Sequence, residues 1–244
     1  MAEASGGLAA VDPGRHDLVL FDLDGVITPT AELHRAAWAD LFTDYSFTED
    51  DYLRFIDGRS RYDGVRAFLA SRDVHLPEGH PDDPPGDESV CALGNRKDSA
   101  FRERLDRGGV LPYPDATRLI ERLDPPGVAS AVVSSSRNAR GVLAAAGLLQ
   151  RFEVVVDGVV IDSEGIPGKP SPAPFLLAAR RSGVDPARTV VIEDAESGVT
   201  AGASGGFGLV IGVDRVGARE ALLAAGADVV VDDLDEVVVS EVLS

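Results

Sequence analysis

Short apolar runs with helical segments between them constrain the fold of this chain more than any other feature. The runs are rich in valine and isoleucine, and they are apolar at consecutive rather than alternate positions. This pattern is typical of strands that are buried on both faces of a sheet. We therefore predict an α/β fold with a Rossmann-like parallel sheet and helices on both faces. The predicted strands are ASAVVSS at 129–135, FEVVVDG at 152–158, RTVVIED at 188–194, GLVIGV at 208–213 and ADVVV at 227–231, joined by a first strand at 17–22.

The stretch that follows the first strand has a different texture. Thr28 and Pro29 match the N-cap and the first position of a helix, and apolar residues then recur at helical spacing. No strand-like run occurs from there to about residue 108, so we expect this stretch to form an inserted helical unit. The predicted domains are a loose N-terminal tail at 1–16, a core domain at 17–29 and 110–244, and a helical cap domain at 30–109.

The charge balance of the chain argues against two classes of partner. The formal net charge is −18, so nucleic acids and anionic membrane surfaces would be repelled.

No apolar run reaches the roughly 18 residues of a membrane span, and the start of the sequence does not have the pattern of a signal peptide. The single cysteine, Cys91, allows no intrachain disulfide, which suits a reducing compartment. We expect a cytoplasmic monomer whose partner is a small anionic molecule.

Lysine is rare in this sequence. Only Lys97 and Lys169 are lysines among the 23 basic residues. The lysine ammonium is a compact point charge, which the broader guanidinium of arginine cannot replace at every site. The two lysine positions are therefore candidates for function, although chance alone could also leave two lysines in the chain.

Polar residues follow the predicted strands where they end. Asp22 and Asp24 follow the first strand, and Glu193 and Asp194 end another. Ligands of open parallel sheets bind beyond these strand ends, and buried carboxylates need a counter-charge. A donor set made only of oxygen suits Mg²⁺. Donors that could grip phosphate oxygens are Ser134, Ser135, Ser136, Arg137, Asn138 and Lys169.

The paired aspartates suggest a division of labour in phosphoryl transfer. One carboxylate could attack phosphorus to form an aspartyl phosphate, and the other could transfer a proton. Taken alone, the DLDG segment could instead be a turn, and SSSRN could be a turn that caps a helix. Unpaired buried acids are so costly that the full set of residues favours the metal and phosphate interpretation.

Four motifs in series, DLDGVITPT, SSSRN, GKPSP and VIEDAESG, resemble those of the haloacid-dehalogenase-like phosphotransferases, and in detail those of the β-phosphoglucomutase family. The resemblance covers about residues 17–235. It implies that Asp22 is the nucleophile and Asp24 the general acid/base. It implies the metal ligands Asp22, the main-chain carbonyl of Asp24, Glu193 and Asp194, with Ser134 binding phosphate and Lys169 neutralising the transferring group.

The predicted cap domain carries further matches to the same family. TAELHRAAW places His34 and Trp38 one helical turn apart, DGRSRYDGV resembles the cap loop, and GNRKD places Lys97 at the cap lysine. The resemblance implies that Arg61 receives the distal phosphate. The implied substrate-binding residues are His34, Trp38, Gly58, Arg61, Lys97, Ser136, Arg137 and Asn138. Two departures are Pro29, where aspartate is frequent, and Ala195, where serine is common.

Other patterns in the sequence carry less weight. GASGG at 202–206 fits a hydrolase expression, but a helix precedes it and a strand follows it, which is the reverse of the required order. His75 and His80 lack the partners of a zinc site, and no nucleotide-binding glycine motif or internal repeat is evident.

Three functions are consistent with these residues. The first is a Mg²⁺-dependent mutase that converts β-glucose 1-phosphate to glucose 6-phosphate, with glucose 1,6-bisphosphate as the activating intermediate. The second is a phosphatase, in which water takes the phosphoryl group. The third is a non-catalytic protein that binds a sugar phosphate, against which the intact Asp22 and Asp24 argue.

Overall fold

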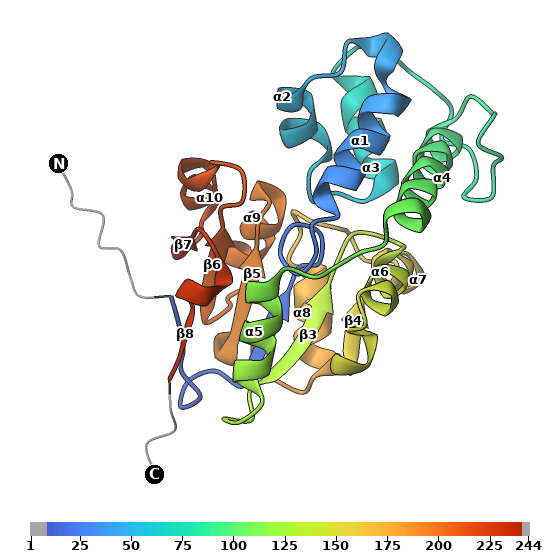
Figure 1. The fold of residues 1–244 in the computed structure, drawn as a ribbon. Coiled ribbons are helices and arrows are strands. Elements are labelled where there is room, and N and C mark those ends of the chain that lie inside the picture. Colours follow the sequence, from blue (N-terminus) through green and yellow to red (C-terminus); the bar gives the residue numbers. More distant parts are fainter. Residues whose placement is uncertain (1–8, 241–244) are drawn as a thin grey trace.

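A parallel sheet forms the centre of the molecule. The computed structural model describes residues 9–240, and its main sheet has six strands in the order β4-β3-β2-β5-β6-β7, all of them parallel. The α/β prediction is therefore confirmed (Figure 1). The strands are β2 (Leu18–Phe21), β3 (Ala129–Val133), β4 (Val154–Val156), β5 (Thr189–Glu193), β6 (Leu209–Val213) and β7 (Val229–Val231).

Both faces of the sheet are covered, which explains why the strands are apolar at consecutive positions. Along β2, Val19 and Phe21 belong to the apolar cluster on one face, while Leu18 and Leu20 belong to the cluster on the other. Helices α5 (Pro114–Leu123) and α6 (Ala139–Ala145) supply the first cluster. The second cluster draws on α7 (Gly158–Glu164), α8 (Ala173–Arg181), α9 (Glu196–Ser204) and α10 (Arg219–Ala225).

A helical cap lies over the carboxyl ends of the strands (Figure 1). Trp38, Phe42 and Phe68 are among the buried side chains of its own small apolar core. The hydrogen bond from the Tyr113 N–H to the Ile27 carbonyl, 2.8 Å long, ties together the two linkers that join the cap to the core. The cap consists of α1 (Ala31–Leu41), α2 (Glu49–Asp51), a π-helical turn (Tyr52–Ile56), α3 (Arg61–Ala70) and α4 (Val90–Gly108).

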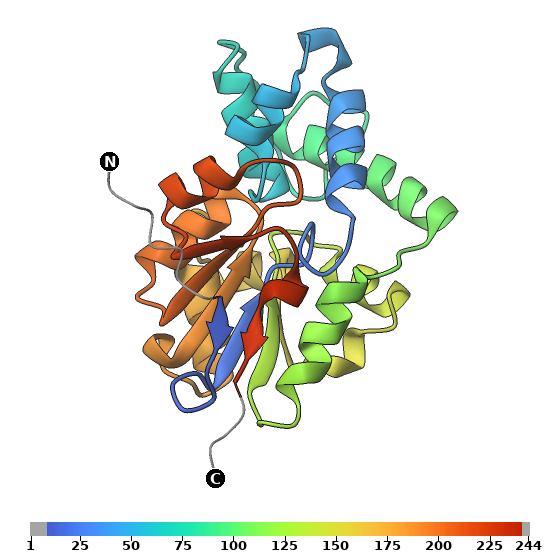
Figure 2. The same cartoon turned by 60° about the vertical axis from the view of Figure 1, so that its left-hand side comes forward.

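Two local predictions are wrong. Part of the expected tail at 1–16 is ordered, because β1 (Ala10–Val11) pairs in parallel with β8 (Val238–Val239) beside the main sheet (Figure 2). The first cap helix begins at Ala31 and not at Thr28, since the Thr28 hydroxyl donates to the Leu23 carbonyl and closes the preceding turn. Residues 1–8 and 241–244 lie outside the described residues.

No helix in the described part of the chain has the length and apolar character needed to cross a bilayer.

Candidate active site

A pocket opens where the central strands end beneath the cap. Asp22 follows β2, Ser134 follows β3 and Glu193 is the last residue of β5. Since β2 lies between β3 and β5 in the sheet, this is the edge at which ligands bind in open α/β sheets. The polar residues that line the pocket are Asp22, Asp24, His34, Tyr52, Asp57, Arg59, Arg61, Lys97, Asp98, Ser134, Ser135, Ser136, Arg137, Asn138, Glu193 and Asp194.

Lys169 lies beneath the pocket and joins two of its acids. Its side chain is 0% exposed, and its ammonium donates to Asp22 Oδ1 at 2.5 Å, to Glu193 Oε1 at 2.6 Å and to the Val133 carbonyl at 3.1 Å. Burial opposes the charge, but the two carboxylates outweigh it and raise the pKa of Lys169. The ammonium is therefore fixed as a cation at the floor of the pocket.

The acids around Lys169 would carry more negative charge, if all were ionised, than its single ammonium can neutralise. One oxygen each of Asp22, Glu193 and Asp194 lie within 4.8 Å of one another. Burial, with the charges of Glu193 and Asp24, raises the pKa of Asp22 to about 8 despite Lys169. Burial and Glu193 raise the pKa of Asp194 well above its usual range. Such raised values show that this cluster lacks positive charge.

These three carboxylates fit a magnesium ion. Their ligand atoms are all carboxylate oxygens, and they converge from two strand ends. A divalent cation would also neutralise their negative charge. Two main-chain N–H groups, of Asp194 and Ala195, donate to Glu193 Oε2 at 2.9 and 3.0 Å and orient that carboxylate. Asp24 contributes no side-chain oxygen to this cluster.

Glycine at position 25 is required by space and by backbone geometry. Gly25 has a φ of +94°, and a Cβ there would lie 1.8 Å from Asp194 Oδ2. Its N–H donates to the Thr28 carbonyl at 2.7 Å and closes the turn after the two aspartates. The glycine of the DLDG motif thus leaves space for the Asp194 carboxylate.

Asp24 lies on the opposite side of the turn and is held by cap residues. The Thr30 hydroxyl donates to Asp24 Oδ1 at 2.5 Å, and His34 Nε2 lies 3.3 Å from the same oxygen. Burial favours the protonated form, but His34 and Thr30 outweigh it and lower the pKa of Asp24 to about 2. Asp24 is therefore a carboxylate at neutral pH. The Ser134 hydroxyl contacts its second oxygen at 3.3 Å.

His34 connects Asp24 to the buried cap lysine. Lys97 Nζ contacts His34 Nδ1, and the His34 ring stacks on Phe101 with the centroids 4.0 Å apart. Lys97 Nζ also lies 5.2 Å from the ring centroids of Trp38 and Phe101. Burial and the charge of Arg61 lower the pKa of Lys97 to about 7. This lysine can therefore change its charge near neutral pH.

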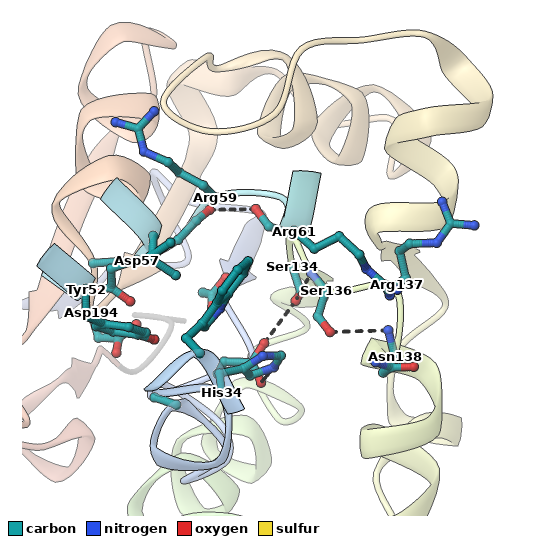
Figure 3. A pocket seen from close by; sticks show the side chains of 18 of the residues that line it. His34, Tyr52, Asp57, Arg59, Arg61, Ser134, Ser136, Arg137, Asn138 and Asp194 are labelled. Carbon is teal, nitrogen blue, oxygen red and sulfur yellow. Dashed lines mark hydrogen bonds and ion pairs between the residues drawn. The ribbon is translucent and has the colours of Figure 1, made fainter. Parts of the chain in front are cut away.

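The far wall of the pocket carries guanidinium and amide groups. Arg61 is 12% exposed and pairs with Asp98 at 2.9 Å, and Asn138 Nδ2 donates to the same carboxylate at 2.6 Å. Arg137 pairs with Asp162. In Figure 3, Tyr52, Asp57 and Asp194 lie on one side of the pocket, and Arg137 and Asn138 lie on the other.

Ser134 and Ser136 shape the backbone after β3. The Ser136 N–H donates to the Ser134 hydroxyl at 3.0 Å, and the Asn138 N–H donates to the Ser136 hydroxyl at 3.2 Å. These bonds fold the segment into a turn beside Asp24, with both hydroxyls at the pocket wall (Figure 3).

Every site residue predicted from the sequence lines this pocket except Lys169, which lies just below it. The structure thus brings them together, while their individual roles stay predictions. Sequence reasoning missed Tyr52, Asp57, Arg59 and Asp98 as lining residues. Asp57 directly precedes Gly58 and Asp98 directly follows Lys97, so the segments that contain them were identified while the acids were not.

The rejected GASGG pattern is not a nucleophile turn. Ser204 is the last residue of α9, and β6 follows it, whereas a nucleophile turn needs a strand before the serine and a helix after it.

Comparisons with known proteins agree with this geometry. The chain is 44% identical over 234 residues to a β-phosphoglucomutase of Mycobacterium bovis, with 89% of each chain covered. It is 30% identical over 198 residues to a fructose-1-phosphate phosphatase of Escherichia coli, which covers 80% of this chain and 96% of that one. A crystal structure of β-phosphoglucomutase from Clostridium difficile superposes with a TM-score of 0.76 at 23% identity, covering 91% and 92% of the two chains. Residues 16–206 match the profile of the haloacid dehalogenase-like hydrolases, and the chain belongs to that family.

Proposed function

We propose that the protein is a magnesium-dependent mutase that interconverts β-glucose 1-phosphate and glucose 6-phosphate through glucose 1,6-bisphosphate. The observation that carries the proposal is that the Asp22 carboxylate and the cap cations Arg61 and Lys97 face one pocket. A mutase must hold phosphate at both ends of its substrate, and cap cations can bind the end that is not reacting. The mycobacterial relative that carries the name β-phosphoglucomutase supports the same choice.

In the proposed cycle, Asp22 carries the phosphoryl group at the start. The 6-hydroxyl oxygen of β-glucose 1-phosphate attacks phosphorus, the bond between phosphorus and the Asp22 oxygen breaks, and Asp24 accepts the hydroxyl proton. The low pKa of Asp24, which results from His34 and Thr30, keeps it in the form that accepts a proton.

The second half of the cycle reverses these roles on the other phosphoryl group. The bisphosphate turns end for end, Asp22 attacks the phosphorus at C1, and the bond to the sugar oxygen breaks. Asp24 returns its proton to the departing oxygen, so glucose 6-phosphate leaves and phosphorylated Asp22 is regenerated. At the end of the cycle Asp22 is phosphorylated again and Asp24 has lost the proton that it accepted, so the protein returns to its starting state.

The remaining charged residues would neutralise and orient the phosphoryl group. A Mg²⁺ ion bound by Asp22, Glu193 and Asp194 would supply positive charge for the transferring oxygens. Lys169, already bonded to Asp22 at 2.5 Å, would add a second positive charge on the same side. Closure of the cap would exclude water from the phosphorylated aspartate.

A phosphatase is the alternative that a specific observation favours. The Escherichia coli relative, whose length the match nearly spans, is named for release of phosphate from fructose 1-phosphate. The same residues would act in a phosphatase, with a water molecule in place of the sugar hydroxyl. The two activities differ only in the acceptor that reaches phosphorylated Asp22.

One incubation separates the two activities. The protein is mixed with Mg²⁺ and β-glucose 1-phosphate, with and without a trace of glucose 1,6-bisphosphate, and both glucose 6-phosphate and free phosphate are assayed. A mutase produces glucose 6-phosphate at a rate that rises with the bisphosphate, with little free phosphate. Release of phosphate without isomer would establish the phosphatase, and absence of both products would contradict both functions.

A further inference from the structure

Two serine hydroxyls of the core bind the backbone of a cap loop that lines the pocket. The Ser135 hydroxyl donates to the Gly58 carbonyl at 2.7 Å, and the Ser197 hydroxyl donates to the Asp57 carbonyl at 2.9 Å. Ser135 follows β3 and Ser197 lies in the first turn of α9. Consecutive carbonyls of one cap loop are therefore bound from two different segments of the core.

Neither serine is used by the chemistry proposed above. In the SSSRN segment, Ser134 contacts Asp24 and Ser136 accepts from the Asn138 N–H, whereas the hydroxyl of Ser135 between them reaches the cap. Ser197 lies beyond the metal cluster and is not among the residues that line the pocket. Their shared partner is the loop that links the π-helical turn to α3.

The loop fits closely onto the core at this point. A Cβ at Gly58 would lie 2.1 Å from the Ser197 hydroxyl and 3.2 Å from the Ala195 Cβ. Since no side chain larger than hydrogen would fit at position 58, the backbone of Gly58 packs directly against the start of α9. The small side chain of Ala195, one of the two departures from the family pattern, packs under the loop.

The same loop carries residues that line the pocket. Asp57 and Arg59 flank Gly58, and Arg61 begins α3 just beyond them. Figure 3 shows Asp57 on the same side of the pocket as Asp194, with Arg61 across its top. Fixing the carbonyls of residues 57 and 58 therefore fixes where one pocket wall and Arg61 stand relative to Asp22.

We propose that Ser135 and Ser197 are positioning residues that hold the cap loop shut and so determine whether a sugar hydroxyl or water reaches phosphorylated Asp22. This inference rests on the proposed phosphoryl transfer and names the contacts that set its outcome. Each bond is a neutral hydrogen bond that can break and form again as the cap moves, and its net contribution is small enough to permit opening. Together the two bonds favour the closed state through the backbone of the cap loop.

The test uses Ser135→Ala, Ser197→Ala and the double variant. Hydrogen exchange of the amides of residues 57–59 needs no turnover. The Asp57 and Arg59 N–H groups donate to the Tyr52 and Ile56 carbonyls within the cap, so faster exchange reports that the loop is less ordered once its own carbonyls lose the core serines. We expect exchange to accelerate by roughly threefold to tenfold in each single variant, and by more in the double variant. The ratio of phosphate release to glucose 6-phosphate formation should rise over a similar range, because water gains access.

Matched controls separate positioning from a general loss of structure. Ser204→Ala removes a hydroxyl from the same helix as Ser197, where it bonds only the Ala201 carbonyl at 3.2 Å. Ser163→Ala removes a hydroxyl that bonds the Val160 carbonyl within α7. Both controls should leave loop exchange and the product ratio unchanged. Ser135→Thr keeps a hydroxyl, so it should restore much of the protection from exchange that Ser135→Ala loses.

The outcomes distinguish this inference from the proposed function. Unchanged exchange of residues 57–59 in the double variant would overturn the positioning role, even in an active mutase. Faster exchange with an unchanged product ratio would overturn the link to water access. A protein that forms neither product contradicts the proposed function, while the exchange measurement still decides whether the serines hold the loop.

Discussion

The two lysines of this chain are both buried, yet their surroundings shift their pKa values in opposite directions. Lys169 lies between Asp22 and Glu193, which stabilise its charge. Lys97 lies among Trp38, Phe101 and His34, where burial and the charge of Arg61 disfavour the ammonium form. Lys169 is thus a fixed charge, whereas Lys97 is a charge that an anionic ligand would stabilise.

Replacing Lys97 should stabilise the protein while weakening its binding of sugar phosphate. The folded-state pKa of about 7 is below the ordinary value of 10.5, so protonation of Lys97 opposes folding. This penalty is complete below pH 7 and disappears as the pH rises toward 10.5. Lys97→Met should therefore raise Tm, by more at pH 6 than at pH 9, and raise KM for β-glucose 1-phosphate. A Tm gain that is equal at both pH values would contradict the assigned pKa.

Asp22→Asn should abolish phosphoryl transfer without unfolding the protein. An amide cannot attack phosphorus, so we expect kcat to fall by about 10³-fold or more, measured as formation of glucose 6-phosphate and of phosphate. Asp17→Asn is the matched control, because Asp17 lies just before the other end of β2 and pairs with Arg188. Normal turnover in Asp22→Asn would remove Asp22 from the nucleophile position.

At the scale of elements, the first turn of α9 packs against Glu193, one of the three clustered acids. A Cβ at Gly198 would lie 1.7 Å from Glu193 Oε1. That carboxylate cannot move aside easily, because Lys169 and the N–H groups of Asp194 and Ala195 hold it. The sequence of α9 is therefore constrained by an acid of the preceding strand as well as by helix propensity.

Gly198→Ala should displace Glu193 and weaken Mg²⁺ binding, although alanine favours helix formation. We expect at least a tenfold loss of Mg²⁺ affinity, measured by isothermal titration. Gly141→Ala is the control, since no atom lies within 4 Å of a Cβ at that helical position. It should leave Mg²⁺ affinity unchanged and add about 0.5 to 1 kcal/mol to the free energy of unfolding. Equal affinities in the two variants would show that the Glu193 position is not limiting.

Sequence analysis missed helix α7 and the strands β1 and β8 for two different physical reasons. Helix α7 follows β4 so closely that VVVDGVVI is one apolar stretch, and only the Asp157 side chain, which accepts from the Val160 N–H at 2.9 Å, marks the change to helix. Strands β1 and β8 have two residues each and pair from opposite ends of the chain. Patterns of neighbouring residues carry little information about such distant pairs.

At the scale of the whole molecule, the acids of the pocket should make the stability of the fold depend on a divalent cation. Asp22 and Glu193 share the buried ammonium of Lys169, and Asp194 lies in the same cluster of acids. Burial, with the charge of Glu193, also raises the pKa of Asp57 to about 7, and this cap residue lines the same pocket. Folding therefore gathers acids whose ionisation is unfavourable until a bound cation offsets their charge.

Mg²⁺ at about 100 times its dissociation constant should add roughly 2.7 kcal/mol to the free energy of unfolding. For a chain of this size, Tm would rise by roughly 5 to 10 °C in thermal unfolding. Asp194→Asn, which removes one ligand charge, should show a much smaller rise, whereas the exposed Asp82→Asn should behave as the parent protein. An equal rise in Asp194→Asn would place the bound ion elsewhere.

The sequence predicted the core half of the site better than the cap half. Asp22, Ser134 and Glu193 end parallel strands, and the sheet itself brings such ends together. The contacts of Asp57 and Ser197 depend on how the cap is seated on the core, which local patterns do not specify. The family resemblance located cap segments such as DGRSRYDGV, while the contacts between loops became visible only in three dimensions.

The hydrogen bond between Tyr113 and Ile27 fastens the outgoing and returning linkers to each other at the base of the cap. Two linkers that are joined at this level leave the cap one narrow covalent attachment to the core, so we expect any opening of the cap to pivot there. A distance between one spectroscopic label on the cap far from Tyr113 and one on the core should then change more on opening than a distance between labels placed beside Tyr113.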